Sequence, residues 1–169
     1  MSATAAARSS GMTPKKVPGY GVTVSLPAEW VGSAPPAEAA SFGVRYLYRA
    51  PEVISGFHAN LNLIVSPIPA GMTLRQWLFS GASAAFQYAG TTTAVSINGV
   101  RGLHYESTKA TRFGSRPLLT DEYAFVREGH VFLLTYTALA STRARYEPVF
   151  SASSETVRFS AKPLAGVSA

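Results

Sequence analysis

The segment Val131 to Leu139, VFLLTYTAL, constrains the fold of this chain more than any other stretch, because apolar residues fall on both of its alternating faces. A strand of that kind belongs in the middle of a sheet that is covered on both sides. Leu119 to Val126 is its expected hairpin partner, joined to it through Glu128-Gly129. We therefore expect a sheet with further layers above and below it.

Other strand signals extend this sheet. Apolar and polar residues alternate over residues 20–26, 44–49 and 59–68, and strands are expected there. In the second of these strands, Val44, Tyr46 and Tyr48 are expected to share one face. Asn98-Gly99, a dipeptide suited to the positive φ angles of a tight turn, separates two more strands at 92–97 and 100–108. Residues 31–42 have the composition of a loop.

Two segments carry helix signals. Thr73 and Gln76 have the spacing of a capping box, and an apolar face recurs at helical spacing from Leu74 to Tyr88. A second helix is expected near residues 147–157, with Pro148 in its first turn, where a missing N–H is tolerated. The combined pattern predicts an α/β (α+β) three-layer sandwich, with a largely antiparallel sheet of about six or seven strands and helices on both faces.

Length and composition indicate one domain. The chain has 169 residues, enough to bury a core without staples, and the absence of Cys excludes disulfides and thiolate zinc sites. Residues 1–18 are small, polar and end in Pro, so we expect a disordered N-terminal tail, a domain over 19–159 and a C-terminal tail over 160–169.

The same composition leads to expectations about location. No signal-like apolar run is present, which favours a bacterial cytoplasmic protein, whereas a removed signal would place it in the cell envelope. No stretch is long and apolar enough to be a membrane span.

The net charge of +6 does not indicate nucleic-acid binding. Part of the excess lies in the tails, at Arg8, Lys15, Lys16 and Lys162. The remaining Arg residues are scattered among acids, whereas a nucleic-acid surface would gather them in a stripe with stacking aromatics. No nucleic-acid partner is therefore expected.

Four landmarks together resemble one family. They are GYGVTVSLPAEW at 19–30, ANLNLIVSPI at 59–68 before the capped helix, NGVRGLHYE at 98–106, and TYTAL with RYEPVFSASSETVRF at 135–139 and 145–159. Over about residues 19–159 the chain resembles the PsbP-like superfamily, which includes DcrB-type proteins, LpqN-type lipoproteins and the Eag chaperones of secretion systems. It differs from the lipoproteins because it has no Cys to carry a lipid.

The resemblance implies non-catalytic work. It suggests a protein-binding adaptor or a secretion-associated chaperone, whose partner would be a protein such as a secreted effector or its hydrophobic segment. The first alternative is an envelope-associated protein of the LpqN type that binds a ligand or lipid. No shared active site or cofactor comes with the resemblance, and the oligomeric state stays open.

A weaker alternative is a hydrolase-like enzyme. His104 and Glu106 lie two apart on an expected strand and share a face, and Asp121 can oppose them from the next strand. Such proximity suits general acid–base work, although the exposed polar face of a hairpin explains the same pattern. His58 and His130 lack metal spacing, and no Ser stands in a nucleophile elbow. We therefore assign no catalytic, cofactor-binding or metal-binding residue and expect no enzyme.

The candidate partner-binding residues are aromatic or basic. Tyr and Arg combine contact area with hydrogen-bond donors and are frequent at interface hot spots. On the strand at 44–49 they are Arg45, Tyr46, Tyr48 and Arg49, and in loops Phe57, His58 and Phe113 form a second candidate surface. The alternative for the strand residues is that both Tyr pack in the core while the Arg side chains face solvent.

Overall fold

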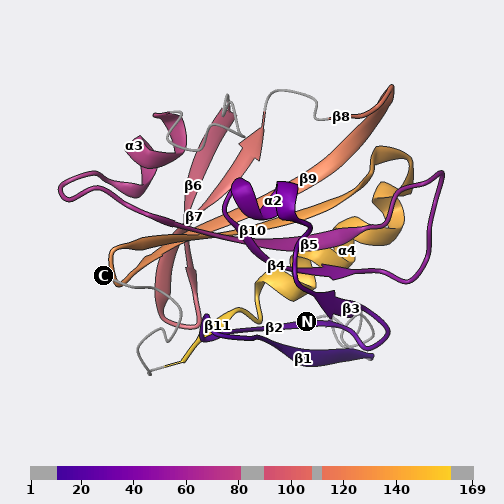
Figure 1. Cartoon of the computed structure of the whole chain (residues 1–169), viewed down its shortest axis with the longest axis horizontal. Coiled ribbons are helices and arrows are strands. Elements are labelled where there is room, and N and C mark those ends of the chain that lie inside the picture. Colours follow the sequence, from indigo (N-terminus) through magenta and orange to yellow (C-terminus); the bar gives the residue numbers. More distant parts are fainter. Residues whose placement is uncertain (1–10, 81–89, 108–111, 161–169) are drawn as a thin grey trace, which may run out of the picture.

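A large antiparallel sheet organises the computed structural model, which describes residues 11–80, 90–107 and 112–160 (Figure 1). Its eight strands include β8, which pairs with β9 beside the main path. In sheet order they are β3 (Val31–Ser33), β4 (Val44–Arg49), β5 (Asn60–Pro67), β10 (His130–Leu139), β9 (Arg116–Arg127), β7 (Val100–Ser107) and β6 (Gly90–Ile97), with β8 at Arg112–Phe113. The expected antiparallel sandwich is confirmed.

β10 lies near the middle of this sheet, between β5 and β9. Every residue from Val131 to Leu139 is buried. Phe132, Leu134 and Tyr136 pack into one core cluster, whereas Val131 and Leu133 pack into another on the opposite face. The inference that this two-sided apolar strand lies in a covered sheet is confirmed.

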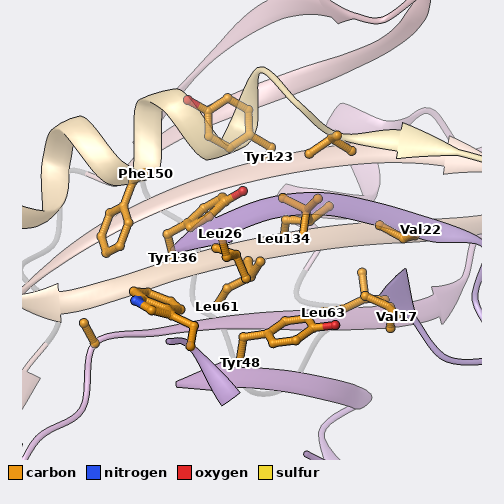
Figure 2. Close-up of a cluster of buried hydrophobic side chains, with 14 of the residues drawn as sticks. Val17, Val22, Leu26, Tyr48, Leu61, Leu63, Tyr123, Leu134, Tyr136 and Phe150 are labelled. Carbon is orange, nitrogen blue, oxygen red and sulfur yellow. The ribbon is translucent and has the colours of Figure 1, made fainter. Parts of the chain in front are cut away.

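One face of the sheet is covered by helix α4 (Arg143–Ser154) and by a small second sheet (Figure 2). A short 3₁₀ helix, η1 (Ala140–Thr142), leads from β10 into α4. The small sheet contains β1 (Met12–Val17), β2 (Val22–Pro27) and β11 (Arg158–Phe159). Phe150 of α4 and Leu26 of β2 join Tyr136 in the larger core cluster.

Two short helices, α2 (Ala37–Ser41) and α3 (Leu74–Phe79), cover the other face (Figure 1). Trp77 and Leu78 of α3 are buried in the second cluster. The capping box is confirmed, since the Thr73 side chain accepts from the Gln76 N–H while the Gln76 side chain accepts from the Thr73 N–H. Residues 81–88 of the expected helix lie outside the described residues. Within the described ranges, no helix is long and apolar enough to cross a membrane.

The N-terminal boundary corrects a prediction. Residues 12–17 form β1, paired with β2 along its whole length, although we expected them in a disordered tail. Only Val17 of β1 is buried, because this strand lies at the edge of its sheet and can therefore be polar. The strand expected at 20–26 forms β2 in the small sheet and is not part of the large one.

Three local expectations were also wrong. α4 begins at Arg143, so Pro148 lies beyond its first turn, and an Arg143–Glu147 ion pair supports the added turn. The expected loop at 31–42 contains β3 and α2. A register shift between Val44 and Tyr46 places Val44 in the α3-side cluster, away from the face of Tyr48.

Candidate functional site

Tyr48 belongs to the core, where its hydroxyl donates a 2.7 Å hydrogen bond to the Lys16 carbonyl. Burial raises the pKa of Tyr48 to about 12, with a smaller contribution from Tyr46. The two tyrosine rings meet edge to face at 5.2 Å. A side chain on Gly32 would lie within 2.5 Å of the Tyr48 ring, so the absence of a side chain at this position lets β3 approach.

Arg45 and Arg49 are exposed on the same strand. The Arg45 guanidinium reaches the Ala40 carbonyl at 3.5 Å, and that of Arg49 reaches the Ser33 hydroxyl at 3.5 Å. Both contacts are long for hydrogen bonds. Among the four candidates on this strand, Arg45 and Arg49 are exposed and their guanidinium groups remain available to a partner, whereas Tyr48 is buried and Tyr46 is half-buried.

The loop between β4 and β5 is held in one shape by a tight turn. Ile54 and Phe57 exchange two backbone hydrogen bonds, of 2.9 and 3.0 Å, around Ser55-Gly56. Both central residues have positive φ, +51° and +78°, as a type I′ turn requires. Arg116 donates to the Ser55 carbonyl, and Glu52 forms an ion pair with Arg145 at the start of α4.

Two candidate aromatics meet on this loop. The rings of Phe57 and Phe113 lie 5.2 Å apart at 58°, although one comes from the β4–β5 loop and the other from β8. Phe113 is 43% exposed, and neighbouring Val53 is 55% exposed. This pair confers apolar surface on the end of the sheet where Arg112 and Arg116 are also exposed.

His58 and Arg49 line a cavity of about 210 Å³, together with Val31, Ser33, Ala50 and Pro51. The Nδ1–H of His58 donates to the Ala50 carbonyl at 2.8 Å, which orients the ring. Arg49 brings a positive charge to the cavity, and none of the described residues that line it is acidic. We call Val31, Arg49, Val53, Phe57, His58 and Phe113 the loop-end surface.

A larger cavity of about 340 Å³ lies between α4 and the sheet. His104 and Asp121 meet there through an Nε2 to Oδ1 contact of 2.5 Å, and the Tyr123 ring stacks on the imidazole at 4.6 Å. The side chain of Glu106 lies outside the described residues. His104 and Asp121 therefore lie within hydrogen-bond reach of each other beside a cavity.

These polar groups also attach α4 to the sheet. Tyr123 interacts with Asp121 and with Ser154 of α4, and burial, as the largest cause, raises its pKa to about 12. In parallel, Tyr136 and Ser153 share a buried hydrogen bond of 3.0 Å. The Asp121 carboxylate therefore lies in a network that spans two layers, which is a structural use of the same groups.

The sequence analysis did not predict the tight turn at Ser55-Gly56, nor the contacts of Val31 and Arg116 that support the loop-end surface. Ser-Gly is a turn signal, and Ile54 and Phe57 flank it, so the tight turn could have been found. The contributions of Val31 and Arg116 depend on segments that the fold brings together. Among the described residues, no group of three or more His, Asp or Glu side chains could hold a metal ion.

Comparison with known proteins identifies the architecture. No protein-family model matches this chain, and no curated protein sequence matches it. Among solved structures it is similar to the cyanobacterial PsbP, CyanoP, of Synechocystis sp. PCC 6803, with a TM-score of 0.62 at 16% identity over 89% of this chain and 93% of that one. The chain has a PsbP-like fold.

Two further structures are consistent with the PsbP-like fold. A protein from Bacteroides thetaiotaomicron gives a TM-score of 0.56 at 14% identity, where 90% of this chain corresponds to 50% of the other. Protein PA94 of unknown function from Pseudomonas aeruginosa gives 0.53 at 13% identity, over 90% of this chain and 98% of that one. Identities this low establish the fold alone, and the resemblance expected from the sequence is confirmed at that level.

Proposed function

We propose that this PsbP-like domain is a non-catalytic adaptor that binds a segment of a partner protein through the loop-end surface. The observation that carries the proposal is the contact between the exposed Phe113 and the half-buried Phe57, which lies on a turn that is already held in place. A loop that is ordered before binding loses little conformational freedom when a partner docks.

The chemistry of the surface favours a partner segment that has both apolar and acidic side chains. Phe57, Val53 and Phe113 supply apolar contact, and aromatic residues are enriched among interface anchors. Arg112 precedes Phe113 in β8, Arg116 donates to the carbonyl of Ser55 in the turn, and Arg49 lines the cavity beside His58. Glu52 of the same loop is already paired with Arg145. A hydrophobic segment of a secreted effector, flanked by acids, would meet these requirements, and a cytoplasmic location would suit that role.

The proposal is tested by affinity capture from the native host, followed by mass spectrometry. Replacing both Phe57 and Phe113 by Ala should reduce recovery of the partner at least about tenfold, because the apolar centre of the interface is lost. Val126→Ala is the matched control, since Val126 is 40% exposed at the other end of β9. Equal recovery with all three proteins, or no partner with the wild type, would count against the adaptor role.

A second candidate function is favoured by the His104–Asp121 contact beside the 340 Å³ cavity. In this alternative Asp121 orients His104 as a general base for ester hydrolysis. Hydrolysis of p-nitrophenyl acetate should then fall at least about tenfold in His104→Gln while the fold is retained. Equal rates for wild type and variant would leave only the structural role of the pair.

A further inference from the structure

β6 has the composition of a strand that pairs with another chain. It is an edge strand of the large sheet, and among the described strands only β7 pairs with it. Its sequence, GTTTAVSI, is eight residues long and contains β-branched residues but no charge and no Pro. Proteins normally protect edge strands with Lys, Pro or short length, because a free edge is a template for pairing.

The other edges in this molecule carry those protections. β3, at the opposite edge of the large sheet, is only three residues long. β1, at the edge of the small sheet, has the sequence MTPKKV, with a Pro and two Lys, and β11 at the other edge has two residues. β6 therefore differs from every other edge strand described in this chain, which indicates that its open edge is used.

We propose that β6 pairs antiparallel with β6 of a second copy of this chain, about a two-fold axis at Ala94. Ala94 then faces its own copy, Thr92 opposes Ser96 and Thr93 opposes Val95. The side chains of Thr91, Thr93, Ala94 and Ser96 are exposed, and within the described residues no strand pairs with the outer edge of β6. Both copies use the same patch, so the assembly closes as a dimer.

This register is self-complementary. Val95 and Ile97 pack on the α4 side of the sheet. In the proposed pairing, this face of one copy continues into the same face of the second copy. Arg101 of β7 is registered beside Ser96, whereas Tyr105 is registered beside Thr92. Because Ser96 of one copy opposes Thr92 of the other, Arg101 of one copy lies in line with Tyr105 of the other. The two Arg101 side chains are therefore not opposed. A strand without charge tolerates its own copy as a neighbour, which favours a second copy over a foreign strand.

Sedimentation velocity of the full chain across the micromolar range tests the proposal. The wild type should sediment as twice the 17.9 kDa chain. Ala94→Lys places two ammonium groups opposite each other at the axis and should raise the dimer Kd at least about tenfold. Ala94→Glu should do the same, and an equimolar mixture of the two variants should restore a dimer, because opposite charges then meet.

Ala144→Lys, at an exposed position on α4, is the matched control and should remain dimeric. Circular dichroism of each variant verifies that the monomer is folded. A wild type that is monomeric throughout the range overturns the proposal, even if β6 captures a different protein. A dimer that persists unchanged in Ala94→Lys overturns it as well, since the interface then lies elsewhere.

Discussion

At the scale of single residues, Glu122 is a carboxylic acid buried inside the large sheet. It is 4% exposed, and its Oε1 accepts a 3.1 Å hydrogen bond from Thr135 on the neighbouring strand. Burial raises its pKa to about 7, and the adjacent Asp121 adds to the effect. Asp121 and Glu122 are consecutive on β9, so their side chains point to opposite faces of the sheet. Both faces are covered, and the Glu122 side chain is buried under one of them.

This burial predicts how stability depends on pH. Unfolded Glu has a pKa of about 4.3, so the native state binds the proton more tightly. That contribution is complete below the unfolded pKa and is lost as pH rises through about 7. Glu122→Gln cannot ionise, so between about pH 4 and pH 8 the wild type should lose about 3 kcal/mol of unfolding free energy relative to it. Urea denaturation of both proteins at several pH values measures this difference, and parallel profiles would contradict it.

At the scale of elements, the attachment of α4 depends on polar pairs as well as on Phe150. Tyr136 and Ser153 are both fully buried and bond to each other at 3.0 Å. Removing either hydroxyl leaves the other without this partner in a dry layer, where an unsatisfied group costs more than the net worth of the bond.

A double-mutant cycle tests this attachment. Tyr136→Phe and Ser153→Ala should each lower the free energy of unfolding by about 1–3 kcal/mol, and the double variant should lose less than the sum. Ser151→Ala, at an exposed position of the same helix, is the control and should change stability little. Additive losses in the cycle would mean that the two hydroxyls act independently. Urea unfolding supplies all four free energies.

At the scale of the whole molecule, the N-terminal strand is part of the domain. β1 pairs with six residues of β2, Val17 is 5% exposed, and the Lys16 carbonyl accepts from the buried Tyr48 hydroxyl. A chain that begins at Gly19 should therefore unfold with about 3 kcal/mol less free energy than one that begins at Gly11. Chemical denaturation of the two truncated chains checks this, and equal stabilities would show that β1 is dispensable.

The sequence by itself determined the elements whose signals are local. The strand at 44–49, the capping box at Thr73, the turn at Asn98-Gly99 and the two-sided apolar strand at 131–139 each depend on neighbours within a few residues, and all were found, although the face of Val44 was not. These features were sufficient to indicate a covered antiparallel sheet, and with the family landmarks they pointed to the PsbP-like fold. The tight turn at Ser55-Gly56 was equally local, and its signal was overlooked.

Only the tertiary structure decided how distant segments meet. β1 is polar because it is an edge strand, and its pairing with β2 is not written in its own composition. His104 meets Asp121 because β7, which holds His104, pairs with β9, which holds Asp121. β9 also pairs with β8, which holds Phe113, and Phe113 there meets Phe57 of the β4–β5 loop. The physical reason is that local hydrogen bonding and side-chain alternation shape each strand, whereas strand order and layer packing depend on burying the apolar surface of the whole chain at once.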